Sequence, residues 1–482
     1  MFDLRPVGYV IGLLVAVLGG TMLIPMGVDL AYGSADWAVF LESAVITIMV
    51  GGSMAIASAN GLGQGLTIQQ TFLLTTGVWV ALPLFAALPF VLGDTDLRVV
   101  DAIFEAMSGL TTTGSTILSG LDDLPKGVLL WRSMLQWFGG VGIIVVAMVF
   151  MPELRVGGMQ IFRTEAFETM GKILPRAAQI ASRISAIYVT LTLLCIAMYL
   201  AVGLPGFHAV NHALTTMSTG GFSTHDASFG MYQGAPEYVA SVFMILASLP
   251  FVRFVQLTAG TARPLLRDSQ VHAFLLTMVS LVVIIALYRI FANDDHLVHS
   301  FREALFNVTS IMTGTGFASV DYQLWGGFPV VLFFFLGLIG GCAGSTCCSV
   351  KIFRYQILFE SIRSQIARIH TPHSVRQPRF NGRPVGEDAL SSVMAFFVMF
   401  VVTLGVLSVM LGLTGLDFVT SVSGAATAVA NIGPGLGDII GPSGNFAALN
   451  DTAKWILSAA MLIGRLELLA VFVLFTPGFW RG

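Results

Sequence analysis

The chain has 482 residues, of which 55% are hydrophobic and only 11% charged, with a formal net charge of −3 and a mean hydropathy of +0.84. Soluble domains carry about 25% charged residues, so the composition excludes a water-soluble globular protein. The charge balance gives no indication of a nucleic-acid partner, and the spacing of the four cysteines indicates neither a disulfide framework nor a zinc site.

Apolar runs of membrane length recur along the chain. A bilayer core of about 30 Å needs about 20 helical residues, and most of the runs reach that length or approach it. In chain order they are 7–26, 38–57, 71–92, 128–150, 184–202, 239–251, 273–291, 328–339, 393–411 and 456–475. The sequence therefore predicts an all-α polytopic membrane protein.

Four short segments dense in Thr, Ser and Gly interrupt these apolar runs, each with a glycine near its middle. The central glycines are Gly114, Gly220, Gly316 and Gly433, which are 106, 96 and 117 residues apart counting along the sequence. Such recurrence predicts pseudo-fourfold symmetry around one axis. Four glycine-containing loops facing one axis can present a ring of backbone carbonyls, which replaces the hydration shell of a monovalent cation.

Each glycine follows a short amphipathic segment that is too short to cross a bilayer. The segments are FEAMSGLTTTG (104–114), VNHALTTMSTG (210–220), FNVTSIMTGTG (306–316) and SGAATAVANIG (423–433). They predict half-helices whose C-terminal carbonyls point toward the membrane centre, where their partial negative charge favours a cation. The alternative is that the small residues serve close helix packing.

The repeats divide the chain into seven parts. Two extra N-terminal transmembrane helices (1–62) precede a first helix–half-helix–helix repeat. The remaining boundaries place repeat 1 at 63–152, a cytoplasmic connecting helix at 153–179, repeat 2 at 180–262, repeat 3 at 263–357, a basic cytoplasmic loop at 358–385 and repeat 4 at 386–482. Basic connections mark the cytoplasmic side, so the four loops face the acidic, external side.

Two further features lie within the spans of repeats 3 and 4. The segment 337–349 is rich in glycine and cysteine, and Gly disfavours helix, so we interpret it as a movable gate, with a close helix crossing as the alternative. Arg465 lies mid-span with Glu467 nearby, and an intramembrane arginine indicates a functional residue. The alternatives are a snorkelling side chain or a structural pair with Glu467, although their spacing points them in different directions.

The ordered motifs TTTGST, STGGFS, TGTGFAS and ANIGPG, followed by GGCAGST and LIGRLE, resemble those of the TrkH/KtrB/HKT superfamily of potassium transporters, and the two extra N-terminal spans resemble the TrkH branch. The resemblance implies four pore repeats, a homodimer in the cytoplasmic (inner) membrane, and a TrkA-like cytoplasmic subunit with nucleotide-binding RCK domains. It implies potassium uptake rather than enzymatic activity, with potassium as the transported substrate and no cofactor. Proton symport and passive flow both remain open.

Carried onto this sequence, the resemblance implies a set of pore residues. The positions that contact potassium are Thr112, Thr113, Ser218, Thr219, Gly314, Thr315, Asn431 and Ile432. The gate comprises Gly340, Gly341, Gly344, Ser345, Thr346 and Arg465. Glycine at all four central positions favours potassium, and sodium or sodium-coupled transport, as in the Ktr and HKT relatives, is the alternative. The pair Cys347-Cys348 departs from the glycines that many members carry there.

Overall fold

The computed structural model describes residues 3–61, 66–149, 158–159, 161, 177–371 and 377–481. The connecting helix predicted at 153–179 falls almost wholly outside these residues. Within them the regular structure is helical, apart from one short hairpin of β1 (Arg379–Phe380) and β2 (Arg383–Pro384).

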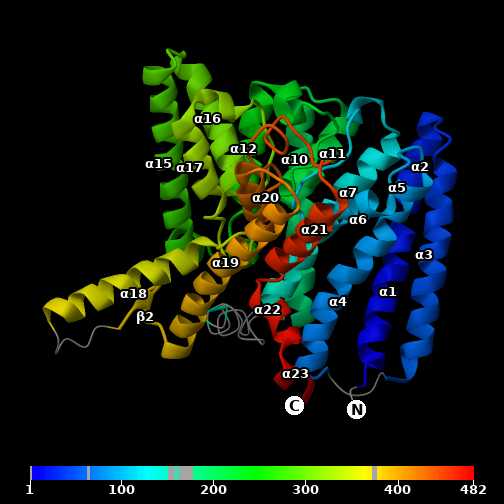
Figure 1. The fold of residues 1–482 in the computed structure, drawn as a ribbon, viewed down its shortest axis with the longest axis horizontal. Helices are drawn as coiled ribbons and strands as arrows, with labels where there is room; N and C mark the ends of the chain where they lie inside the picture. Colours follow the sequence, from blue (N-terminus) through cyan, green and yellow to red (C-terminus); the bar gives the residue numbers. More distant parts are fainter. Residues whose placement is uncertain are drawn as a thin grey trace.

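The long helices account for most of the predicted spans (Figure 1). They are α1 (Arg5–Thr21) continued by α2 (Leu23–Tyr32), α3 (Trp37–Ser58), α4 (Ile68–Ala86) continued by α5 (Leu88–Leu92), α7 (Lys126–Val149), α10 (Ala177–Ala201), α15 (Ser269–Ala292) and α19 (Glu387–Leu413). In the described part of the chain, seven helices are long and apolar enough to cross a membrane, or up to nine if two bent pairs count as one span each. The prediction of a polytopic α-helical membrane protein is confirmed.

The four segments before the glycine loops are short helices. They are α6 (Val99–Leu110), α11 (Gly206–Met217), α16 (Leu297–Met312) and α20 (Phe418–Ala430). At 1.5 Å per residue they are about 18–24 Å long, too short to cross a bilayer. All residues of α6 from Asp101 to Leu110 are buried, so this part of the helix is surrounded by protein on every side.

Three of the four helices that follow the loops are broken. α12 (Ala235–Ala247) and α13 (Phe251–Thr258) meet at 90°, and α21 (Asp451–Arg465) meets α22 (Leu469–Phe472) and its continuation at 106°. α17 (Gly327–Gly337) is only 11 residues long, and a non-helical stretch separates it from α18 (Ile352–His370). The apolar runs at 239–251 and 456–475 therefore belong to bent pairs of helices, and of the four helices that follow the loops only α7 runs unbroken.

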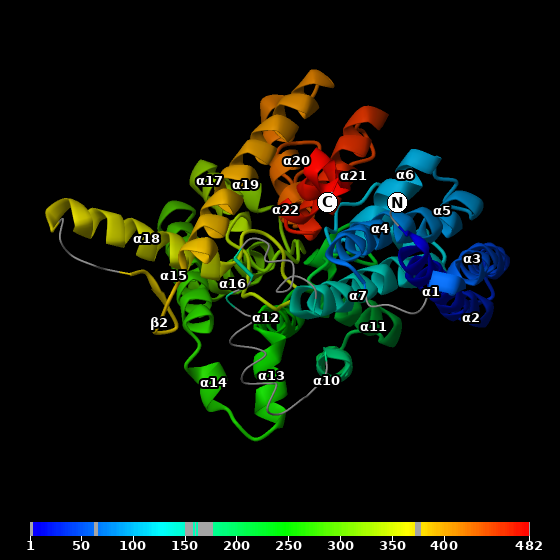
Figure 2. The same cartoon turned by 90° about the horizontal axis from the view of Figure 1, so that it is seen from below.

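The basic connection 358–385 is not a loop over its whole length. α18 continues to His370, and Thr371, which precedes Pro372, lies outside the helix, because the residue before a proline is disfavoured in helical conformation. The hairpin β1–β2 occupies part of the remainder. In Figures 1 and 2, α18 extends away from the rest of the molecule.

The two N-terminal helices pack through glycines. A Cβ on Gly12 would lie 2.6 Å from the backbone nitrogen of Ala55, and one on Gly51 would lie 2.5 Å from that of Ala16. Helices in lipid associate where small residues allow their backbones to approach. Helices α1 and α3 therefore form a tight pair beside the four repeats (Figure 1).

The remaining elements are short. They are α14 (Arg263–Leu266), α23 (Pro477–Arg481) and the 3-10 turns Ala59–Gly61, Leu121–Asp123, Ser228–Tyr232, Tyr322–Trp325 and Val473–Phe475.

Candidate functional site: four loops and the broken helices beside them

The four short helices end in the same way. Each ends with a residue of positive φ whose N–H bonds three residues back, followed by a residue whose N–H bonds five residues back, which is the Schellman arrangement. The five-back bonds join the N–H groups of Thr113, Gly220, Thr315 and Ile432 to the carbonyls of Ser108, Thr215, Ser310 and Thr427, at 2.9, 2.9, 2.8 and 3.1 Å. The four loops are thus the same backbone structure repeated.

This repetition corrects the register of the second loop. The positive-φ pattern is Thr112 and Gly114, Thr219 and Gly221, Gly314 and Gly316, and Asn431 and Gly433. Gly221, not Gly220, is therefore the equivalent of the other three central glycines. The residues that precede it, equivalent to Thr112 and Thr113, are Thr219 and Gly220, whereas Ser218 is the C-cap of α11.

The four loops close into a ring. A Cβ on each equivalent glycine would collide with one carbonyl oxygen of the next loop, and the contacts run in a single cycle. The added Cβ would lie 2.2 Å from the carbonyl oxygen of Gly220 at Gly114 and 1.9 Å from that of Thr315 at Gly221. It would lie 1.8 Å from that of Ile432 at Gly316 and 2.9 Å from that of Thr113 at Gly433. Glycine is required at each position because both the φ angle and the space exclude a side chain.

Two of the loops carry threonine in a backbone conformation that threonine avoids. Thr112 has φ of +52° and Thr219 has φ of +51°. Left-handed φ is uncommon for β-branched residues and costs of order 1–3 kcal/mol. Such strain persists only where the surroundings fix the backbone, and it marks this ring as a functional region.

Each loop is also tied back to its own short helix. Glu105 accepts from the N–H of Ile117 at 2.9 Å, Asn307 from that of Ser319 at 3.2 Å, and Ser423 from that of Leu436 at 2.9 Å. In the second repeat, the buried His212 contacts Ser223 at 3.1 Å. We did not predict these residues from the sequence, although the polar residue five to eight positions before each loop was visible there.

Arg132 is part of this support. Its side chain is 1% exposed and pairs with Glu105 at 2.8 Å. It also donates to the Ser223 carbonyl at 2.9 Å and to Thr116 at 3.0 Å. A buried ion pair needs such additional hydrogen bonds to offset desolvation, and here they join the loops of repeats 1 and 2.

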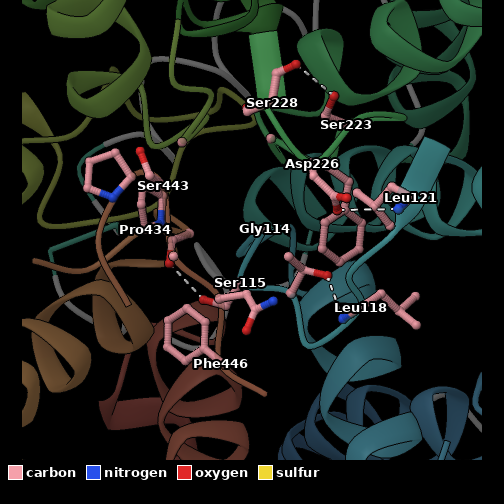
Figure 3. Close-up of a pocket in the computed structure, with 18 of the residues that line it drawn as sticks. Gly114, Ser115, Leu118, Leu121, Ser223, Asp226, Ser228, Pro434, Ser443 and Phe446 are labelled. Atoms are coloured by element: carbon pink, nitrogen blue, oxygen red, sulfur yellow. Dashed lines mark hydrogen bonds between the residues drawn. The ribbon is translucent and has the colours of Figure 1, made fainter. Parts of the chain in front are cut away.

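A cavity of about 390 Å³, which we call the mouth cavity, lies against one side of the ring. Its lining includes the equivalent glycines Gly114, Gly221, Gly316 and Gly433, but not Gly220. Figure 3 shows side chains from different repeats, such as Ser115, Asp226 and Ser443, around this mouth cavity. His225, also in the lining, pairs with Asp122 and lowers the pKa of that carboxyl by hydrogen bonding.

The expected gate segment is irregular backbone held by hydrogen bonds. Gly340 and Gly344 have φ of +72° and +74°. The segment pairs with the break between α12 and α13, because Cys342 donates to the Ser248 carbonyl at 3.0 Å and Phe251 donates to the Gly344 carbonyl at 2.9 Å. Glycine and proline thus leave unpaired backbone groups on two segments of the chain, and these groups satisfy each other.

Arg465 lies at the end of α21 and is 1% exposed. Its guanidinium donates to the carbonyls of Thr346 at 3.3 Å and Gly139 at 2.8 Å, and also contacts the sulfur of Cys348. The hydroxyl of Thr219 donates to that of Thr346 at 3.2 Å, so Thr346 contacts both a ring loop and the arginine.

Glu467 does not pair with Arg465. Its carboxylate forms ion pairs with Lys351, at 3.1 Å, and with Arg354. Glu467 and Leu468 both have positive φ, at +60° and +47°, and form the break after α21. The three breaks therefore meet in one layer, which we call the break layer (residues 248–250, 338–351 and 465–468).

Among the described residues, no group of three or more His, Cys, Asp or Glu side chains could hold a metal ion. The polar groups of the ring are backbone carbonyls, hydroxyls and the side-chain amide of Asn431. Backbone carbonyls suit a weakly held monovalent cation.

Comparison with known proteins gives consistent matches over the whole chain. The sequence model of the TrkH family, described as "Cation transport protein", matches residues 37–480. The Trk system potassium uptake protein TrkI of Halomonas elongata is 42% identical, covering 99% of this chain and 97% of that protein. The Trk system potassium uptake protein TrkH of Salmonella typhimurium is 36% identical, covering 99% of each.

A solved structure agrees with these sequence relatives. The crystal structure of the potassium transporter TrkH from Vibrio parahaemolyticus matches with a TM-score of 0.90 at 32% identity, over 100% of both chains.

Proposed function

This chain belongs to the TrkH family of cation transport proteins and is a potassium uptake transporter, and we propose that the ion crosses the membrane through the ring of four loops. The proposal rests mainly on the cyclic contact of the four equivalent glycines with four carbonyls. Carbonyl rings of this kind select among monovalent cations without any covalent chemistry. The mouth cavity supplies the approach from the external side.

The residues that contact potassium, in the corrected register, are the two before each equivalent glycine. They are Thr112 and Thr113, Thr219 and Gly220, Gly314 and Thr315, and Asn431 and Ile432. Their contribution is the backbone carbonyl, so the presence of Ile432 in the fourth loop leaves the ring intact. The C-terminal ends of the four short helices add a partial negative charge.

We propose that the break layer is the gate. Gly340, Gly341, Gly344, Ser345 and Thr346 form irregular backbone that moves without breaking a helix, and Arg465 holds Thr346 in place. A cation that leaves the ring toward the cytoplasm would meet the positive charge of Arg465. Release of the Thr346 contact would therefore lower both a steric and an electrostatic barrier.

We further propose a homodimer in the cytoplasmic membrane, controlled by a TrkA-like subunit that binds nucleotide. α18 supports the homodimer because Phe359, Ile362, Ile366 and Ile369 form an exposed apolar stripe along it, with exposed fractions of 65%, 45%, 53% and 78%. Extended unpartnered apolar surface marks an interaction site.

The experiment that tests the function is uptake of Rb⁺ into liposomes that contain the purified protein, with K⁺ or Na⁺ as competitor and with or without an imposed pH gradient. Inhibition by K⁺ but not by Na⁺ is the expected result. Equal inhibition by both would favour the alternative, sodium or sodium-coupled transport. Uptake that rises with an inward proton gradient at constant voltage would indicate symport.

The variant Gly114→Ser tests the ring in the same assay. A Cβ at this position would lie 2.2 Å from the Gly220 carbonyl, and φ is +86°. We expect the preference for Rb⁺ over Na⁺ to fall at least tenfold, because the displaced carbonyl no longer fits the ion. Unchanged selectivity would contradict the assignment of the ring as the filter.

A further inference from the structure

Gln136 lies on α7 and contacts the second loop from behind. Its side chain is fully buried. The amide nitrogen donates to the Gly220 carbonyl at 2.6 Å, and the amide oxygen accepts from the N–H of Phe222 at 3.0 Å. This orientation of the carboxamide is the one in which both contacts are hydrogen bonds. Gln136 therefore spans the pair Gly220-Gly221 with both of its polar atoms.

Gln136 also occupies the space where the second loop lacks a side chain. A Cβ on Gly220 would lie 2.4 Å from both Cδ and Oε1 of Gln136. The equivalent positions of the other loops carry Thr113, Thr315 and Ile432. Gly220 has no positive φ, so its backbone does not require glycine. The glycine is there because Gln136 fills the side-chain space.

The first and third loops are braced from within. The hydroxyls of Thr111 and Thr113 are 2.7 Å apart, and those of Thr313 and Thr315 are 2.8 Å apart. The second loop has Ser218 at the first of these positions but only Gly220 at the second, so it cannot form this brace.

We propose that Gln136 is a specificity-determining positioning residue, which fixes the Gly220 carbonyl in the ring and thereby sustains selectivity for potassium. The inference rests on the proposed function of the ring. Among the ring residues, Gly220 is the one whose carbonyl both lies against the neighbouring glycine, Gly114, and accepts a side-chain hydrogen bond. Without that bond, the carbonyl has no internal brace to hold its distance from the ion.

The test measures Rb⁺ and Na⁺ uptake in liposomes for Gln136→Ala and for Gln136→Met, which keeps the side-chain volume but removes both hydrogen bonds. We expect the ratio of Rb⁺ to Na⁺ uptake to fall about tenfold in both variants. The net free energy of such hydrogen bonds corresponds to roughly a tenfold change. Should Gln136→Ala not fold, Gln136→Met carries the test. A folded variant with wild-type selectivity would overturn the proposal.

A paired exchange separates positioning from mere stability. Gly220→Thr alone should lose selectivity because its side chain collides with Gln136. In Gln136→Ala/Gly220→Thr, the new threonine enters the vacated space and can bond Ser218, as Thr113 bonds Thr111. We expect this double variant to recover a ratio within about threefold of wild type. A double variant worse than both single variants would overturn the proposal.

Gln323→Met is the matched control. Gln323 also clamps a loop with both polar atoms, accepting from the Gly437 N–H at 2.7 Å and donating to its carbonyl at 3.4 Å, but it contacts no ring carbonyl. The Rb⁺/Na⁺ selectivity of Gln323→Met should match that of the wild type. A fall in selectivity equal to that of Gln136→Met would overturn the specific role of Gln136. Wild-type protein without K⁺-sensitive Rb⁺ uptake would instead refute the proposed function itself.

Discussion

The ring and the break layer lie close together but are built on opposite principles. The ring consists of four copies of one backbone structure, and its contacts join glycines to carbonyls of the next loop. The break layer uses three unlike interruptions of helices and is held by charged side chains from Arg465, Lys351 and Arg354. Backbone symmetry suits the binding of one ion by four loops. Asymmetric side-chain contacts suit the gate that we propose for the break layer.

The difference predicts that the ring fails when an atom is added and that the layer changes when a charge is removed. The largest expected effect is for Gly316→Ala, whose Cβ would lie 1.8 Å from the Ile432 carbonyl at a φ of +83°. We expect K⁺-sensitive Rb⁺ uptake in liposomes to fall to background.

Gly405→Ala is the control for this variant. Gly405 lies within α19, and a Cβ there would meet nothing within 4 Å. Alanine in a helix interior is favoured over glycine by up to ~1 kcal/mol, so uptake should be unchanged. Wild-type uptake by Gly316→Ala would show that the ring does not close as described.

A smaller effect, of opposite sign, is expected for Arg465→Ala. The change releases the carbonyls of Thr346 and Gly139 and removes a positive charge below the ring. Rb⁺ uptake should rise several-fold with selectivity retained, because the ring is not altered.

Arg289→Ala controls for the loss of any buried arginine. Arg289 is 5% exposed and pairs with Asp295 and Glu303, at 2.7 and 2.6 Å, away from the break layer. The variant Arg289→Ala should destabilise the protein by about 3–5 kcal/mol, the usual effect of breaking a buried ion pair. It should not make Rb⁺ uptake faster. Equal acceleration in both variants would rule out a gating role for Arg465.

The smallest effect concerns the strain stored in the ring. Thr112 has φ of +52° and its hydroxyl has no partner among the described residues. Thr112→Gly should therefore raise the free energy of unfolding by about 1 kcal/mol, the net of relieved left-handed strain and added unfolded-state entropy.

Thr111→Gly provides the comparison for this change. Thr111 has φ of −76° and its hydroxyl bonds both Met107 and Thr113, so glycine there should lower stability. Thermal unfolding in detergent measures both variants. A lower midpoint for Thr112→Gly would show that the loop is not strained at this residue.

The sequence indicated the four loops but not their register. The adjacent Gly220 and Gly221 fit the repeat almost equally well, since a shift of one residue hardly changes spacings of about a hundred. The choice depended on which glycine has positive φ and touches the Thr315 carbonyl. The four short helices were predictable because their amphipathic segments recur before each glycine.

The break layer was only partly predictable. Glycines in the sequence indicated the irregular segment between α17 and α18. Pro250 indicates the break after α12, which we did not predict from the sequence. α18 was equally visible, because its apolar residues recur at helical spacing. The break after α21 contains neither glycine nor proline. It depends on Glu467 meeting Lys351 and Arg354.

By itself, the sequence determined that the protein lies in a membrane, that it is helical and that four glycine loops recur. Hydropathy and glycine content act locally along the chain and can therefore be read from it. Only the tertiary structure decided which glycine enters the ring, that Gln136 fills the space beside Gly220, and that three broken helices meet at Arg465. These contacts join residues about 80 to 330 positions apart, and their energies exist only once the repeats have packed around one axis.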